Sequence, residues 1–153
     1  METLLISACL AGVRCRYDGG GKALPELKEL QARYQLLPLC PEQLGGLPTP
    51  RPPAERRGER VVTREGGDVT QAFQRGAAET LALAQRFGCR KALLKERSPS
   101  CGGGTIYDGA FTGGLKAGDG LTAQALKAAG VRVYGESELD ALLGQSRLDV
   151  AEE

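Results

Sequence analysis

Five cysteines are the residues of this chain best suited to chemistry, and they are Cys9, Cys15, Cys40, Cys89 and Cys101. The chain contains no histidine, which excludes Ser–His–Asp triads, Cys–His dyads and histidine-ligated zinc sites. Thiolates are soft ligands that select zinc and iron–sulfur clusters. The cysteines therefore favour a soft metal centre, with thiolate chemistry as the other use.

Three of the cysteines come directly after or in the loop after short apolar runs, which are typical of buried parallel strands. The pairs of run and cysteine are residues 3–8 with Cys9, 35–39 with Cys40, and 91–95 with Cys101. Adjacent strands lie about 4.8 Å apart, and such folds bind ligands at the carboxyl edge of the sheet. We therefore expect these thiols to converge on one small centre.

The other two cysteines have different expected places. Cys15 lies in the first loop, on the same edge as Cys9, whereas Cys89 precedes its strand. A lone cysteine in a reducing compartment is usually a small buried hydrophobic residue, and we expect this for Cys89.

The spacing of the cysteines is compatible with two kinds of metal centre. A [4Fe–4S] cluster normally takes four cysteines, and with three ligands one iron stays open as a Lewis acid. A zinc site built from Cys9, Cys15, Cys40 and Cys101 is the inorganic alternative. The residues themselves leave open a catalytic site, a module that stores or senses sulfur, and a plain thiol enzyme.

Polar residues close to these cysteines supply candidate catalytic groups. Glu42 follows Cys40 by two residues, behind a proline that restricts the backbone, and a shielded carboxylate is a candidate general base. Ser98 and Ser100 precede Cys101 and are candidate hydrogen-bond donors to a substrate. The alternatives are a helix cap or loop role for the glutamate and local turn capping for the serines.

The elements that position these residues alternate between strand and helix. Helices are predicted from Pro25, from Asp68 or Thr70 to about Phe87, over 122–129 and over 137–143 with Ser137 as cap, and a last strand over 131–134. This alternation predicts a single three-layer α/β domain with a mostly parallel sheet of about four to five strands. We expect a flavodoxin-like order, with the second strand beside the first and the third on the first strand's other side.

The long segments between these elements are predicted to lack regular structure. Residues 41–60 are rich in proline and predict a stiff extended loop, and the mixed charges of 55–60 predict a solvated face. Residues 98–120 predict a glycine-rich loop. We expect one domain over 1–145 and a flexible acidic tail over 146–153.

The net charge, the apolar runs and the first residues of the chain indicate which partners and which cellular location to expect. A net charge of +1 argues against binding long nucleic acids, and no apolar run approaches the roughly 18 residues of a membrane span. The first residues lack a secretory signal pattern, so we expect a cytoplasmic protein with reduced cysteines.

Four blocks of sequence resemble the bacterial thiouracil desulfurase family, long known only as a domain of unknown function. The resemblance runs from about residue 4 to 135, and its blocks are Ile6-Ser7-Ala8-Cys9-Leu10 with Cys15-Arg16-Tyr17-Asp18-Gly19, Cys40-Pro41-Glu42-Gln43-Leu44-Gly45-Gly46-Leu47-Pro48-Thr49-Pro50-Arg51, Gly67-Asp68-Val69-Thr70, and Leu94-Lys95-Glu96-Arg97-Ser98-Pro99-Ser100-Cys101-Gly102.

The resemblance implies a Rossmann-like domain that holds a [4Fe–4S] cluster and removes sulfur from 2-thiouracil, giving uracil and sulfide without net redox change. Carried onto this sequence, the ligands are Cys9, Cys40 and Cys101, with Cys15 as an alternative first ligand. The substrate sulfur would bind the open iron, Glu42 would act as general base, and the serines before Cys101 would hydrogen-bond. Implied partners are a thiolated pyrimidine, a sulfide or sulfur acceptor and cluster-assembly proteins.

Overall fold

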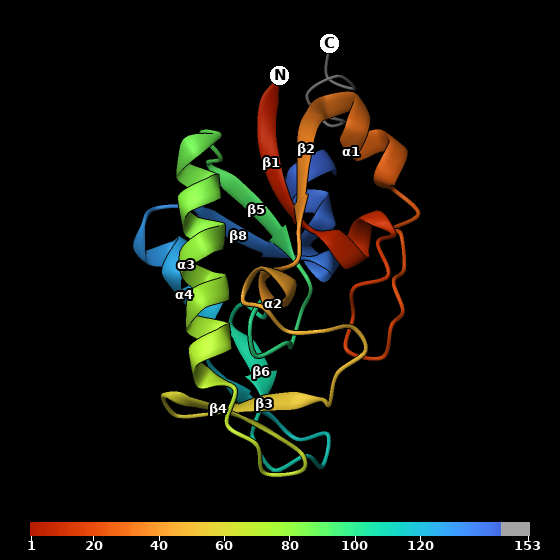
Figure 1. Cartoon of the computed structure of the whole chain (residues 1–153). Helices are drawn as coiled ribbons and strands as arrows, with labels where there is room; N and C mark the ends of the chain where they lie inside the picture. Colours follow the sequence, from red (N-terminus) through yellow and green to blue (C-terminus); the bar gives the residue numbers. More distant parts are fainter. Residues whose placement is uncertain (145–153) are drawn as a thin grey trace.

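A four-stranded parallel sheet forms the centre of the computed structural model, which describes residues 1–144 (Figure 1). The strand order is β2-β1-β5-β8, with bounds β2 Tyr34–Leu39, β1 Glu2–Ser7, β5 Lys91–Leu94 and β8 Arg132–Gly135. All three pairings are parallel. The predicted α/β fold class is confirmed, and the third strand of the sheet lies beside the first, as expected for a flavodoxin-like order.

Helices cover both faces of this sheet and complete three layers. One face carries α3 (Thr70–Arg86) and α4 (Leu121–Ala128), and the other carries α1 (Leu27–Arg33) and a helical segment at 139–144. These helices match the predicted ones to within a few residues. In Figure 1, α3 runs along one side of the sheet with α4 behind it, and α1 lies on the opposite side.

Strand β1 contributes to both halves of the core because successive side chains point to opposite faces. Leu4 and Ile6 pack with Leu30 of α1 in one buried cluster. Leu5 packs in the second cluster, with Leu126 of α4. All these side chains are almost fully buried, which accounts for the unbroken apolar run that identified the strand.

Two glycines allow the short helix α2 (Pro41–Leu44) to lie directly against α3. A Cβ at Gly76 of α3 would lie 2.0 Å from the carbonyl oxygen of Pro41, and one at Gly45 would lie 2.0 Å from that of Ala72. Real side-chain carbons do not approach oxygen so closely, so both positions need glycine. This contact sets where α2 and the residues it carries lie relative to the sheet.

We expect Gly76→Ala to destabilise the protein by about 3 kcal/mol, because overpacked sites cost up to about this much. For a chain of this size that lowers the melting temperature by roughly 6–12 °C. Thermal unfolding followed by circular dichroism measures the shift. Gly144→Ala is the matched control, since a Cβ there meets only an ordinary contact at 3.5 Å; equal melting temperatures for the two variants would contradict the packing argument.

Two β-hairpins occupy segments that the sequence predicted to be loops. The first pairs β3 (Ala54–Arg57) with β4 (Arg60–Thr63), and the second pairs β6 (Thr105–Tyr107) with β7 (Leu115–Ala117). Residues 41–60 also contain helix α2. The prediction of a continuous extended loop over 41–60 is therefore wrong, as is that of a wholly irregular segment over 98–120.

The solvated face predicted at 55–60 is only partly present, because Arg57, Glu59 and Arg60 are exposed and the other two charged side chains are buried. Glu55 and Arg56 are each only 8% exposed. Arg56 donates hydrogen bonds to the carbonyl of Asp119 and to Gln124 Oε1, at 2.7 and 2.8 Å. The prediction failed for these two residues because partners of their buried charges come from segments more than fifty residues away.

The chain beyond β8 begins with a short 3-10 helix, η2 (Glu136–Glu138), before the helical segment at 139–144. Ser137 does not cap this helix as predicted, because its amide and hydroxyl bond to the carboxylate of Glu96. The predicted tail at 146–153 lies outside the described residues. Over 1–144, no helix combines the length and hydrophobicity needed to cross a lipid bilayer.

Candidate active site

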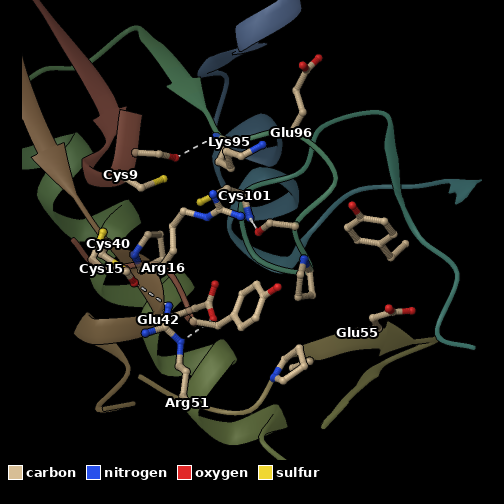
Figure 2. A pocket seen from close by; sticks show the side chains of 18 of the residues that line it. Cys9, Cys15, Arg16, Cys40, Glu42, Arg51, Glu55, Lys95, Glu96 and Cys101 are labelled. Carbon is tan, nitrogen blue, oxygen red and sulfur yellow. Dashed lines mark hydrogen bonds and ion pairs between the residues drawn. The ribbon is translucent and has the colours of Figure 1, made fainter. Parts of the chain in front are cut away.

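A cavity of about 340 Å³ lies where the carboxyl ends of β1, β2 and β5 face the two hairpins. Figure 2 shows it lined by thiols on one side and by acidic and basic side chains around them. A space of this size is sufficient for a small-molecule ligand. Its place at the carboxyl edge of the parallel sheet is where such folds bind ligands.

Four of the five cysteines line this cavity: Cys9, Cys15, Cys40 and Cys101. Cys9 lies in the 3-10 helix η1 (Ala8–Ala11) directly after β1, and Cys40 follows β2. Ser7 of β1 pairs with Leu39 of β2, so the chain leaves both strands at the same level. Cys101 lies in the turn after β5. The predicted convergence of these thiols at one edge therefore occurs.

Burial keeps three of these thiols protonated at neutral pH. Burial raises the pKa of Cys15 to about 12, and the neighbouring Cys40 thiol adds to the shift. Burial also raises the pKa of Cys9 and of Cys101, again with a contribution from Cys40. Free thiols of high pKa are poor nucleophiles, whereas a bound metal deprotonates its thiol ligands.

The donor set fits an iron–sulfur cluster better than a single ion. Within residues 1–144, no three or more Cys, Asp or Glu side chains gather tightly enough to hold one metal ion. The thiols of a [4Fe–4S] cluster must stand further apart, because each binds a different iron. Soft, buried thiols placed on separate elements around a cavity meet that requirement.

Glu42 lies in the first turn of α2 and lines the cavity beside the thiols. Its Oε1 accepts a hydrogen bond of 3.0 Å from Nε of Arg51 in a largely buried ion pair. Its Oε2 makes no hydrogen bond with any described residue. One carboxylate oxygen is thus held in place while the other is available to a ligand.

Arg51 connects this glutamate to the first loop, and sequence reasoning assigned it no role. Its Nη2 donates to the carbonyl of Cys15 at 2.8 Å, and its backbone amide donates to the carbonyl of Tyr17 at 2.8 Å. Its Nη1 also bonds to Pro48 and Thr49. The only signal in the sequence was its place at the end of the block that starts at Cys40.

The structure separates the two predicted serines. Ser98 lines the cavity, and its Oγ accepts the amides of Ser100 and Cys101 at 3.0 and 2.8 Å. It therefore stabilises the turn that carries Cys101, and its own hydroxyl hydrogen is available. Ser100 is buried, does not line the cavity, and shares a 2.8 Å hydrogen bond with Thr122 of α4.

Comparison with known proteins identifies the group of enzymes to which this arrangement belongs. Residues 4–138 match the model of the 2-thiouracil desulfurase family. The chain belongs to this family. The resemblance read from the four sequence blocks is confirmed, and so is the predicted class of enzyme.

Two relatives of this desulfurase-family protein support the assignment over nearly the whole chain. An uncharacterised protein of Bacillus subtilis (strain 168), YbbK, is 43% identical and aligns with 92% of this chain and 99% of its own. A solved structure named as the [4Fe-4S]-dependent thiouracil desulfidase TudS is 49% identical, with a TM-score of 0.89. It covers 95% of this chain and 97% of its own.

In this desulfurase-family protein, Cys89 does not line the cavity. This thiol is buried just before β5, at the amino end of that strand, and belongs to the core cluster beneath α3 and α4. Burial raises its pKa. The prediction that Cys89 is a structural hydrophobic residue is confirmed.

Glu55 is a further buried carboxylate at the cavity, and sequence reasoning placed it in solvent. Its Oε1 accepts the backbone amides of Gly109 and Phe111, at 2.9 and 3.2 Å. Phe111 lines the cavity with a φ of +58°, a left-handed conformation that non-glycine residues rarely adopt. Glu55 therefore connects the first hairpin to the loop of the second and stabilises this part of the cavity wall.

We expect Glu55→Ala to destabilise the protein by about 1–3 kcal/mol, because two partly buried amides lose their acceptor. Hydrogen exchange at Gly109 and Phe111 should accelerate together with the loss of thermal stability. Glu59→Ala is the control in the same hairpin, since the Glu59 side chain is exposed, and we expect a change within about 0.5 kcal/mol. Unchanged exchange in Glu55→Ala would contradict the proposed connection.

Proposed function

We propose that this protein converts 2-thiouracil and water to uracil and hydrogen sulfide, using a [4Fe–4S] cluster held by Cys9, Cys40 and Cys101. The observation that carries the proposal is the gathering of strand-end cysteines around one cavity in a chain of the 2-thiouracil desulfurase family. The name of the TudS structural neighbour, with its [4Fe-4S] dependence, supports the choice of cluster. The reaction replaces sulfur by oxygen at one carbon, so it needs no external oxidant or reductant.

The positions of the four thiols favour Cys9 over Cys15 as the first ligand. Cys9, Cys40 and Cys101 follow three adjacent strands, β1, β2 and β5, so their thiols approach the cavity from different elements. Cys15 lies next to Cys40, whose Sγ is 3.7 Å from the Cys15 carbonyl oxygen. A set containing both neighbours in place of Cys9 would leave the β1 side of the cluster without a ligand.

The residues of the chain supply the proton transfer and the orientation. When bound, a cluster with one iron free of cysteine supplies a soft Lewis acid for the thiocarbonyl sulfur. Glu42 Oε2 accepts the proton of the water that attacks the sulfur-bearing carbon, while Arg51 holds Oε1. Ser98 orients the ring through its available hydroxyl hydrogen. A sulfide acceptor and cluster-assembly proteins remain predicted partners.

The test is anaerobic purification, iron and acid-labile sulfide analysis, and incubation with 2-thiouracil. We expect about four irons per chain and equal amounts of uracil and sulfide. Iron without turnover would keep the cluster and overturn the substrate. Zinc in place of iron would overturn the cluster and favour a module that stores or senses sulfur.

A further inference from the structure

Of the side chains in residues 1–144, four cationic ones line the cavity, and three of them already have partners. The Arg51 guanidinium makes four hydrogen bonds, to Glu42, to Thr49 and to the backbone carbonyls of Pro48 and Cys15. Lys95 pairs with Glu136 at 2.8 Å, and Arg64 lies 5.7 Å from the centre of the Phe111 ring. Arg16 is the fourth, and among residues 1–144 its guanidinium makes no hydrogen bond or ion pair.

Within residues 1–144, none of the acidic side chains of the cavity bonds to Arg16. Glu42 is paired with Arg51, Glu55 accepts two backbone amides, and Glu96 accepts the amide and hydroxyl of Ser137. A guanidinium has five N–H donors and no acceptor. The N–H donors of this half-buried guanidinium face the cavity and can donate to a ligand that binds there.

The backbone around Arg16 is held firmly although its side chain is not. Arg51 bonds to the carbonyls of Cys15 and Tyr17, the residues on either side, and the Arg16 amide donates to Gly20 at 3.0 Å. Figure 2 shows the Arg16 side chain reaching into the cavity on the side of the thiols. The guanidinium thus projects from a fixed point toward the place where a reacting ring would lie.

We propose that Arg16 is a catalytic residue that binds the carbonyl oxygen of the pyrimidine ring, the oxygen at position 4 of 2-thiouracil. This inference rests on the proposed function. The planar fork of the guanidinium orients the ring so that its thiocarbonyl group points at the thiols. Donation to the oxygen also draws electron density from the ring and makes the sulfur-bearing carbon more susceptible to water.

The test compares Arg16→Gln and Arg16→Lys in the iron-loaded protein. We expect Arg16→Gln to lower kcat/KM for 2-thiouracil about 100-fold, the effect of losing one donor to a developing charge, with iron content unchanged. Arg16→Lys should recover part of the loss, since it keeps the charge without the fork. Arg14→Gln is the matched control, because Arg14 is exposed in the same loop and does not line the cavity.

Inhibition by two ring compounds separates substrate contact from a structural role. Uracil keeps the oxygen at position 4, and pyrimidin-2-one lacks it. The wild type should bind uracil at least about 10-fold more tightly than pyrimidin-2-one, since one good hydrogen bond to a charged donor is worth this much. Arg16→Gln should abolish the preference.

Equal inhibition of the wild type by both compounds, or activity of Arg16→Gln within threefold of wild type, would overturn this inference alone. An iron-loaded wild type that releases no sulfide would overturn the proposed function and this inference with it.

Discussion

Replacing Cys101 with alanine is expected to remove the iron–sulfur cluster and to reduce desulfurase activity below detection. Cys101 lies in the turn after β5 and is only 6% exposed. Cys89 cannot replace it, because Cys89 precedes β5 and does not line the cavity. Only two of the three proposed ligands, Cys9 and Cys40, would remain, and these do not satisfy a cluster that normally takes four. Iron content and visible absorbance measure the loss.

Three further alanine variants make this prediction specific. Cys9→Ala should lose the cluster like Cys101→Ala. Cys15→Ala should keep the cluster, because Cys15 lies next to Cys40, which is the proposed ligand on that side of the cavity. Cys89→Ala is the matched buried control and should keep both iron and activity. Full iron content in Cys101→Ala would contradict the three-ligand set, and loss of iron in Cys15→Ala with retention in Cys9→Ala would exchange the roles of those two residues.

Glu42→Gln is expected to keep the cluster and lower kcat by about 100- to 10,000-fold, the range found when general bases are removed. The glutamine retains an oxygen that can accept the hydrogen bond from Arg51, so α2 and Cys40 should stay in place. It has no basic oxygen to accept the proton of the attacking water. Steady-state sulfide release at matched iron content measures the change.

A second cavity carboxylate provides the control for Glu42. Glu96 lines the same cavity, but its oxygens already accept the amide and hydroxyl of Ser137. We expect Glu96→Gln to retain kcat within about threefold, since conservative changes away from the reacting atoms have small effects. Full activity of Glu42→Gln would exclude Glu42 as the base, and equal losses in both variants would indicate a general electrostatic effect of the cavity.

The central sheet and the cysteines at its edge were predictable from the sequence, because both depend on local patterns. Leu4, Leu5 and Ile6 form an unbroken apolar run, and a strand covered on both faces needs such a run. Once the strands are taken as parallel, their carboxyl ends must meet at one edge. The positions of Cys9, Cys40 and Cys101 in the chain therefore implied their convergence.

The groups that complete the site were decided by tertiary contacts. Glu55 and Arg56 carry charge in a proline-rich, mixed-charge segment, which locally predicts solvent exposure; Glu55 is buried because the amides of Gly109 and Phe111 lie against it. Ser98 and Ser100 flank the same proline, yet only Ser98 lines the cavity. Ser100 shares a hydrogen bond with Thr122 of α4 instead.

The sequence by itself determined the family, the strands of the sheet and the edge at which the thiols gather. Only the tertiary structure decided which charged side chains are paired and which are available. Arg51 and Arg16 are both arginines of the recognised blocks, but the Arg51 guanidinium makes four hydrogen bonds, while the Arg16 guanidinium faces the cavity without a partner among residues 1–144. The physical reason is that hydrogen-bond satisfaction depends on groups brought together by folding, whereas the apolar periodicity that defines strands and helices is contained in neighbouring residues.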